Sequence, residues 1–403
     1  MTDVLNLWLH GEHLGTVQQP RTGRTRLRFS DDVVQQWGIG TRLLSYSLPM
    51  TNRRLDTEDV ANFLDNLLPE GAVRAQFEQR YRLRPGDAFG LLTQIGVECA
   101  GAVQLTVDDV PPDGRLVPLT DAETTRIVTE LPTLSAPEGG TLSASLGGVQ
   151  SKVLLTRTDD GWAWPAAGAM STHIIKPEPT DPHVPIRRII EYEHWAMSLA
   201  AAAGIPAART ELMRFGDRLA LVVERYDRAG GRRLHQEDFA QALGIRAGDK
   251  YEATDEPASR LSRIADGPGL EAQDPASFRR ELLRLVTFNL LVGNGDAHAK
   301  NYSLILRDGV FELAPAYDVA PVFYVNPRFS DFGMRLAGQR NLRYLNGTHL
   351  LDEAVQWGMS RQQAQDVVAE TVEGVRGGLE RVSIDDLAEP IAVRVLSRAV
   401  SLL

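Results

Sequence analysis

The segment 293–318, GNGDAHAKNYSLILRDGVFELAPAYD, constrains this chain more than any other part of the sequence. It follows SFRRELLRLVTFNLL, whose apolar residues recur with helical spacing, so the segment is expected to leave a buried, rigid helix. Asp296 and Asn301 are five positions apart in the predicted loop. A strand-turn-strand pattern over 302–315, turning at an Asp-Gly pair, then leads to Asp318.

This order of side chains is typical of a phosphoryl-transfer site. Asp296 is a candidate to orient and deprotonate a hydroxyl, while Asn301 and Asp318 offer oxygen ligands to one Mg²⁺. His298 and Lys300 lie between them and are candidates to contact phosphate or substrate. Taken singly, the three polar residues are better explained as turn formers and a helix cap, and only their combined order favours a site. Zinc fits poorly, because the eight histidines are scattered and none pairs with His or Cys at ligand spacing.

A nucleotide site also needs a cation for the α- and β-phosphates and a place for the purine. Lys176 ends the alternating strand pattern THIIK, and Glu193 follows on a predicted helix at a spacing that allows the two to pair. A solvated helix charge is the other interpretation of Glu193. The strand pattern LALVVERYDR ends in Glu224, Arg225 and Tyr226, a polar corner whose backbone groups are candidates to bind adenine edges.

A glycine-rich stretch, SLGGVQSKVLL, is the candidate phosphate loop. It is a weak signal alone, and it is not a Walker A loop, because it lacks that spacing and leads into a strand pattern. The positions of the lysines also favour a nucleotide site, because only four of the 43 Lys+Arg residues are lysine. Lys152, Lys176 and Lys300 fall in the predicted nucleotide motifs, where a compact ammonium differs from a guanidinium. The fourth, Lys250, lies in DKYE, with a predicted loop-anchoring role.

Composition excludes several classes of protein. With 403 residues, 43% apolar and 24% charged, the chain is expected to be globular, with two or three domains, rather than disordered, collagenous or a coiled coil. No apolar run is long enough to span a membrane and no secretory signal is visible, so a cytoplasmic location is expected. The single cysteine, Cys99, fits a reducing compartment. A net charge of -10 argues against broad nucleic-acid binding. Two arginine clusters are candidate DNA contacts, although a solvated face is favoured for each: Arg225, Arg228, Arg232 and Arg233, and Arg376 with Arg381.

The sequence divides into three predicted parts. Residues 1–108 begin with short strand patterns and turn helical, and PPDG marks a boundary after them. Residues 109–232 mix strands and helices with the glycine-rich stretch. Helices dominate 233–403.

The ordered motifs SASLGGVQSK, THIIKP, YEHWAM, LVVERYDR, KYE, GNGDAHAKN and PAYDVAP resemble those of the HipA family of serine/threonine kinase toxins. The resemblance extends to FLDNLLPEG and LLTQIGVECAGAVQL, so it covers nearly the full length. It implies an α+β, bilobal protein-kinase-like fold with an extra N-terminal α+β subdomain and a mainly helical C-terminal lobe. It also implies ATP and Mg²⁺ as cofactors. The implied partners are a HipB-like helix-turn-helix antitoxin, operator DNA reached mainly through that antitoxin, and a protein substrate such as glutamyl-tRNA synthetase, whose phosphorylation causes growth arrest and persistence.

The resemblance assigns roles residue by residue. Asp296 becomes the catalytic base, and Asn301 and Asp318 become the Mg²⁺ ligands. The implied nucleotide contacts are Gly147, Gly148, Val149, Gln150, Ser151 and Lys152 in the phosphate loop, Lys176, the hinge Glu224, Arg225 and Tyr226, and His298, Ala299, Lys300, Asn301 and Tyr317. Ser145 matches the family's autophosphorylated serine, where added negative charge should eject the loop and switch the kinase off.

Three positions depart from the family pattern, and none removes a catalytic group. Gly147 and Ser151 stand where Ala and Glu are more common, and Gly295 stands where Thr is common. The leading hypothesis is an active protein kinase toxin. The alternatives are a catalytically weak or inactive co-repressor that acts through antitoxin and operator DNA binding, and a kinase acting on a small molecule.

Overall fold

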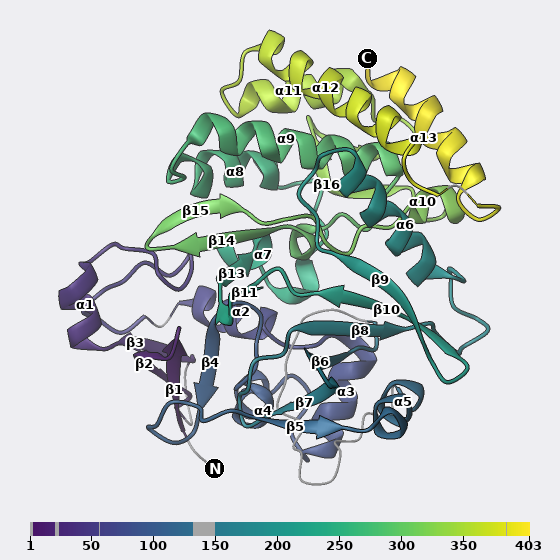
Figure 1. Cartoon of the computed structure of the whole chain (residues 1–403). Coiled ribbons are helices and arrows are strands. Elements are labelled where there is room, and N and C mark those ends of the chain that lie inside the picture. The colour runs from purple at the N-terminus through teal and green to yellow at the C-terminus, as the bar shows by residue number, and fades with distance from the viewer. Residues whose placement is uncertain (1–2, 21–23, 56, 132–149, 384) are drawn as a thin grey trace. The chain divides into compact units, whose positions relative to one another are not determined.

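The computed structural model describes residues 3–20, 24–55, 57–131, 150–383 and 385–403. Ser145 and the predicted loop residues 147–149 therefore lie outside the described residues. The chain forms two compact units, and Figure 1 labels most of their helices and strands. The first unit comprises Met1–Pro177, Met213–Gly248 and Ile305–Gly309, and the second comprises Glu178–Leu212, Asp249–Leu304 and Val310–Leu403.

The first unit opens with an antiparallel four-stranded sheet of order β3-β2-β1-β4. Its strands are β1 (Val4–Leu9), β2 (Glu12–Gln18), β3 (Arg26–Phe29) and β4 (Val103–Thr106). The helices between β3 and β4 are α1 (Asp31–Trp37), α2 (Glu58–Asn66), α3 (Gly71–Arg80) and α4 (Ala88–Ile95). Apolar residues of β1, α2 and α4, among them Leu7, Phe63 and Leu92, are buried in one core. The last strand of this sheet, β4, therefore comes from a segment about a hundred residues after β1, with which it pairs.

A second sheet in this unit has the order β5-β7-β6-β8-β10-β9. Its strands are β5 (Arg115–Leu119), β6 (Val153–Thr158), β7 (Gly161–Ala166), β8 (His173–Pro177), β9 (Thr210–Phe215) and β10 (Arg218–Glu224), and α5 (Asp121–Thr129) follows β5. β8 lies inside the sheet, with Ile175 opposite Val153 of β6 and Lys176 opposite Leu221 of β10. The predicted strand is therefore present, although it continues one residue past Lys176 to Pro177, which pairs with Ala220. The lysine lies between two apolar strands.

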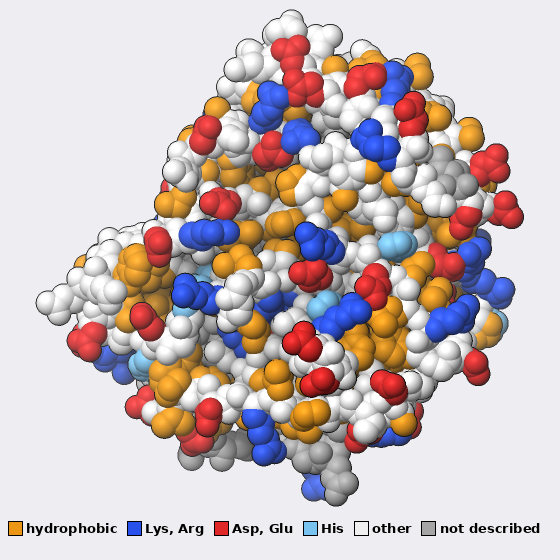
Figure 2. All heavy atoms as spheres, in the orientation of Figure 1, with side chains coloured by type: hydrophobic (Ala, Val, Ile, Leu, Met, Phe, Trp, Pro, Cys, Tyr) orange, Lys and Arg blue, Asp and Glu red, His pale blue; other side chains and the backbone are white. Residues whose placement is uncertain are grey.

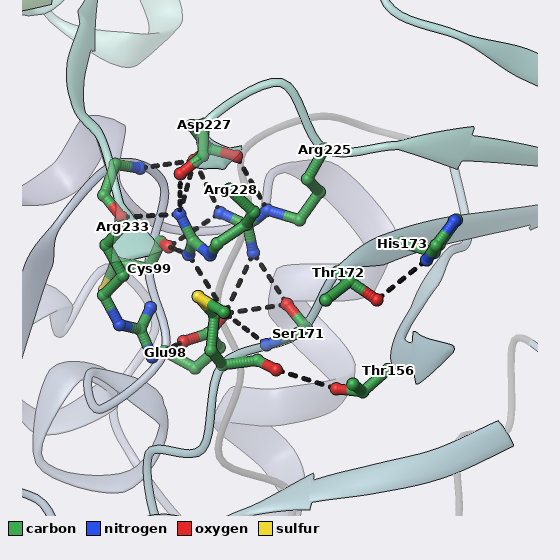
Figure 3. Close-up of polar contacts among 12 residues, drawn as sticks. Glu98, Cys99, Thr156, Ser171, Thr172, His173, Arg225, Asp227, Arg228 and Arg233 are labelled. Carbon is green, nitrogen blue, oxygen red and sulfur yellow. Dashed lines mark hydrogen bonds and ion pairs between the residues drawn. The ribbon is translucent and has the colours of Figure 1, made fainter. Parts of the chain in front are cut away.

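Three arginines and two acids form a charge cluster, defined by Glu98, Arg225, Asp227, Arg228 and Arg233, of which all but the half-buried Arg233 are buried (Figure 3). Both Arg225 Nη1 and Arg228 Nη2 lie close to Glu98 Oε1, at 3.0 and 3.1 Å, and Arg233 contacts the other oxygen. Asp227 Oδ2 lies 2.7 Å from Arg225 Nη2 and 2.9 Å from Arg228 Nη1. The cluster joins residues next to β4 to residues after β10, so it ties the two sheets of this unit together.

The cluster has unequal charges, which affects its titration. Burial opposes ionisation of Glu98, but Arg228, Arg225 and Arg233 outweigh it and hold its pKa below the ordinary value. Burial and repulsion from Arg225 lower the pKa of Arg228 to about 10. These contacts also correct an expectation from the sequence: Arg225 and Arg228 are only 3% and 8% exposed, so they neither form a solvated face nor reach DNA.

A buried carboxyl links the start of the first unit to its later segments. Glu237 accepts hydrogen bonds from the Ser45 hydroxyl at 2.5 Å and from the Tyr46 N–H at 2.8 Å. It lies in β13 (His235–Asp238), which follows β11 (Arg228–Ala229) and β12 (Arg232–Arg233) and precedes α7 (Phe239–Ala242). Burial dominates over both hydrogen bonds and raises the pKa of Glu237 to about 8. The folded protein therefore keeps this proton near neutral pH.

This raised pKa predicts a loss of stability with rising pH. Between the ordinary pKa of 4.5 and about 8 the unfolded chain has released the proton that the folded chain still holds, so unfolding becomes easier as pH rises. The expected contribution is at most about 1.4 kcal/mol per pH unit. Glu237→Gln should flatten this part of the profile, measured by urea unfolding at several pH values. Glu130→Gln, at an exposed site, should leave the profile unchanged; an unaltered slope in Glu237→Gln would contradict the prediction.

The second unit is mainly helical. Its helices are α6 (Ile189–Ala202), α8 (Arg260–Asp266), α9 (Pro275–Val292), α10 (Val322–Val325), α11 (Gly347–Gln356), α12 (Arg361–Leu379) and α13 (Glu389–Leu402). In Figure 1, α9, α11, α12 and α13 pack beside one another. β16 (Asp331–Leu336) pairs with β17 (Gln339–Asn341). Among the described helices, none combines the length and apolarity that crossing a membrane requires.

Candidate active site

Helix α9 supports the candidate catalytic loop. The Asp274 carboxylate caps its start by accepting from the Ala276 and Ser277 N–H groups, and Pro275 takes the first helical position. The helix ends at Gly293, which has φ 69°; there a Cβ atom would lie 2.9 Å from the Tyr324 ring. From Leu285 to Val292 every residue is buried, so the loop starts from a fixed point, as the apolar spacing of this helix predicts.

Two buried asparagines connect the helix to the loop. The Asn294 side-chain amide donates to Asn289 Oδ1 at 2.7 Å, and Asn294 Oδ1 accepts from the Asp296 N–H at 3.2 Å. At Gly295 a Cβ atom would lie 2.4 Å from the Phe329 carbonyl oxygen, which explains why this chain has glycine there. The backbone before Asp296 is therefore positioned by packing and by hydrogen bonds.

Asp296 and Asn301 are brought together as the sequence predicts. The Asp296 carbonyl accepts from the His298 N–H and from Asn301 Nδ2, both at 2.8 Å. Because the Asn301 amide nitrogen is used in this way, its Oδ1 is turned away from that carbonyl and is available as an oxygen ligand. The Asp296 side chain is 47% exposed, and its Oδ1 lies 3.8 Å from His298 Nε2. A half-exposed carboxylate on a rigid loop is suited to receive a proton from a bound hydroxyl.

Asp318 follows a short segment that is fixed at both ends. Ala316 exchanges backbone hydrogen bonds with Pro206 and Ala208, and the Tyr317 hydroxyl donates to the Lys300 carbonyl at 2.9 Å. Asp318 itself has φ 56°, a left-handed conformation that costs a non-glycine residue free energy and that concentrates at functional sites. The predicted strand-turn-strand that leads here is confirmed by β14 (Ser303–Arg307) and β15 (Val310–Leu313), whose turn residues Asp308 and Gly309 have φ 52° and 81°.

The available donors fit Mg²⁺ better than a metal with a full protein cage. Within the described residues no group of three or more His, Cys, Asp or Glu side chains gathers as a metal site. One amide oxygen and one carboxylate, Asn301 and Asp318, are the kind of sparse oxygen set that Mg²⁺ uses together with substrate phosphates. The conformation of the Asn301 amide supports this assignment.

The other predicted nucleotide residues occupy varied positions. Lys176 is buried at 6% exposure in β8, and Gln150, Ser151 and Lys152 precede β6 and are half-buried. His298, Ala299 and Lys300 form the buried part of the loop around Asn301. Glu193 on α6 is only 3% exposed, so the solvated interpretation of this residue is wrong. Burying a lysine or a glutamate is costly, and such positions are enriched at functional sites.

The predicted hinge residues differ from one another. Glu224 is exposed at the end of β10, whereas the Arg225 side chain belongs to the buried charge cluster. The Arg225 N–H donates to the Thr172 carbonyl at 2.9 Å and its carbonyl accepts from Arg228, so both backbone groups are used within the fold. The Tyr226 hydroxyl donates to Gln236. Among the three, Arg225 therefore has a structural role that sequence reasoning did not foresee.

Sequence reasoning also missed two contacts of the candidate base. The first is the support from Asn289 and Asn294, whose only sequence signal is the pair of asparagines flanking the helix end. The second is Tyr251, whose hydroxyl donates to Asp296 Oδ1 from a position 45 residues earlier. The KYE motif drew attention to this segment, but no local pattern connects it to the loop.

Comparison with known proteins identifies the family. Residues 5–106 match the model of the HipA N-terminal domain, and residues 144–378 match the model of the HipA-like C-terminal domain. Y4mE of Sinorhizobium fredii is 34% identical over 94% of this chain and 93% of its own length. The serine/threonine-protein kinase toxin HipA of Shewanella oneidensis is 30% identical over 77% of this chain and 72% of its own length.

A solved structure agrees with these matches. Shewanella oneidensis HipA, in complex with HipB and its operator DNA, superposes with a TM-score of 0.80 at 25% identity and covers 98% of this chain and 96% of that one. The α+β, kinase-like fold expected from the sequence is therefore confirmed. The chain belongs to the HipA family of serine/threonine-protein kinase toxins.

Proposed function

We propose that this protein is an ATP- and Mg²⁺-dependent protein serine/threonine kinase and the toxin of a HipA/HipB-type toxin-antitoxin pair. The observation that carries the proposal is the Asp296–Asn301 loop, in which a half-exposed carboxylate and an oriented amide oxygen stand on a rigid support. A protein that served only as a co-repressor would not need this arrangement. The intact polar set therefore favours the enzyme over the alternative.

Each residue is given one task in the proposed reaction. Asp296 accepts the proton of the substrate hydroxyl, and Lys176 neutralises the α- and β-phosphates. Asn301 and Asp318 hold Mg²⁺, which when bound would screen the phosphate charges. The remaining nucleotide contacts proposed are Gly147, Gly148, Val149, Gln150, Ser151, Lys152, Glu224, Arg225, Tyr226, His298, Ala299, Lys300 and Tyr317. Because the Arg225 side chain is buried, its proposed role is to support the neighbouring hinge residues and not to contact the nucleotide itself.

The proposed partners follow from the Shewanella oneidensis complex. We infer a HipB-like helix-turn-helix antitoxin, with operator DNA reached mainly through it, in the cytoplasm. The charge of the chain fits indirect DNA contact: it is -10 overall, and on the face in Figure 2 the described Lys and Arg side chains alternate with Asp and Glu. The proposed substrate is a translation component such as glutamyl-tRNA synthetase, whose phosphorylation would arrest growth and favour persistence.

Incubation of the purified protein with Mg·ATP, followed by mass spectrometry of the intact chain and of its peptides, tests the proposal. The expected result is one added phosphate at Ser145, the proposed off switch, and phosphate on glutamyl-tRNA synthetase or another protein when cell lysate is added. Absence of phosphate on both the protein and the lysate would contradict the kinase. Antitoxin and operator binding without any transfer would instead support the co-repressor.

Lys176→Arg should weaken the use of ATP although it keeps the charge. A compact ammonium fits between two phosphates, whereas a planar guanidinium is wider and must displace them or the strand. The expected effect is a rise of about tenfold or more in KM for ATP, about 1.4 kcal/mol. Initial rates against ATP concentration measure it, and thermal unfolding checks that β8 tolerates the larger side chain. Wild-type KM in a folded variant would count against the phosphate role.

A further inference from the structure

Tyr251 contacts the candidate base Asp296 but has no role in the mechanism proposed above. Its hydroxyl donates to Asp296 Oδ1, and its ring meets the His298 ring edge to face, with centroids 5.0 Å apart at 88°. The Lys250 ammonium lies 5.8 Å from the Tyr251 ring centroid. Tyr251 is 44% exposed, so burial alone does not hold it there. Its position depends on contacts with the catalytic loop.

The backbone on both sides of Tyr251 is anchored. The Lys250 carbonyl accepts from the Ala299 N–H at 3.2 Å and from Arg260 Nη1 at 2.9 Å. On the other side the Glu252 N–H donates to the Gly333 carbonyl at 2.9 Å. The segment that carries the tyrosine is thus bonded directly to the loop that carries Asp296.

The Glu252 side chain completes the second anchor. It is fully buried and accepts from Arg335 Nε at 2.7 Å and from the Arg335 N–H at 2.8 Å. Arg335 also donates to the carbonyls of Thr254 and Glu256, which lie in the same segment. A tyrosine between two such anchors has little freedom to leave Asp296 by backbone movement.

We propose that Tyr251 is a positioning residue that fixes the carboxylate of Asp296 by holding Oδ1, so that Oδ2 is presented to the substrate hydroxyl. A carboxylate has about four acceptor sites on its two oxygens, so a tyrosine donor at Oδ1 is compatible with a substrate hydroxyl at Oδ2. The inference rests on the proposed kinase function. It differs from a blocking role, in which the tyrosine would occupy the place of the substrate and would have to leave before each turnover.

Tyr251→Phe removes the hydroxyl and keeps the ring against His298. The expected result is a fall of about tenfold in the maximal rate of phosphoryl transfer from Mg·ATP, because a misoriented base reaches the hydroxyl less often. KM for ATP should stay unchanged, since Tyr251 is assigned no nucleotide contact. The rate is measured as autophosphorylation against ATP concentration. In the Asp296→Asn background Tyr251→Phe should cause no further loss, because its effect passes through that carboxylate.

The controls separate this inference from the kinase proposal. Tyr344→Phe changes a tyrosine that is 66% exposed and should leave the rate and the melting temperature unchanged. A Tyr251→Phe variant with the wild-type rate would overturn the positioning role, and a faster variant would show a block instead. Additive losses in the double variant, or phosphate found on Tyr251, would overturn it as well. No transfer by the wild-type protein would overturn the kinase proposal itself, and the positioning role with it.

Discussion

Asp296→Asn is expected to lower the rate of phosphoryl transfer by about 10²–10⁴-fold. An amide cannot accept the proton of the substrate hydroxyl, so the contribution of the base is lost. The fold of the loop should survive, because the contacts that set it, to His298, Asn301 and Asn294, use the backbone of residue 296. ATP should bind at least as well, since one negative charge near the phosphates is removed.

Three measurements make this prediction specific. Rates come from phosphate incorporation, ATP affinity comes from calorimetry, and growth of cells expressing the variant reports toxicity, which should vanish while antitoxin binding persists. Asp366→Asn is the matched control, because that exposed carboxylate on α12 contacts only Gln362 among the hydrogen bonds of the described chain. If Asp296→Asn transferred phosphate at a rate within tenfold of wild type, Asp296 would not be the catalytic base. Growth arrest by the inactive variant would assign toxicity to binding alone.

The part of the site that the sequence predicts is the part whose chemistry is local. Asp296 and Asn301 lie in one loop, the helix before them has an apolar pattern, and the Asp-Gly turn fixes the strands after them. Each of these signals spans a few residues, so spacing alone is enough to read them. Tyr251 shows the limit: it reaches Asp296 across 45 residues, and only the folded anchors at Lys250 and Glu252 bring it there.

The buried charge cluster shows the same limit in the fold. A run of arginines near 225–233 resembles a surface patch, because arginine is normally solvated and the residues lie near a predicted turn. Their partner Glu98 is 127 residues from Arg225, in a segment that reads as an ordinary turn after a helix. Sequence spacing carries no information on such a pairing. The same separation explains how residues 98–101 and 225–233 hold the two sheets of the first unit together.

Glu98→Gln is the substitution with the largest expected effect on stability. It would leave the buried Arg225 and Arg228, together with the half-buried Arg233, with Asp227 as the only carboxylate of the cluster. Breaking a buried ion pair in this way costs about 3–5 kcal/mol. The neutral side chain keeps the size of glutamate and still accepts from the Ser171 hydroxyl, which lies 2.7 Å from Oε1, so packing alone should not account for the loss. The expected result is a melting temperature lower by about 10 °C.

Charge balance can be tested apart from packing by a second substitution. Glu98→Gln with Arg233→Gln removes one charge of each sign, leaving the two deeper arginines with Asp227, and should recover part of the lost stability. Glu130→Gln is the matched control, because Glu130 forms an exposed pair with Arg126 at 3.3 Å that is worth less than about 1 kcal/mol. A melting temperature of Glu98→Gln within about 2 °C of wild type would mean a shift much smaller than that expected for a lost buried ion pair. In that case the cluster does not join the sheets as described. A double variant less stable than Glu98→Gln would show that Arg233 contributes packing rather than repulsion. The stability of the first unit would then depend on how the three guanidinium groups fit together and not on their charge.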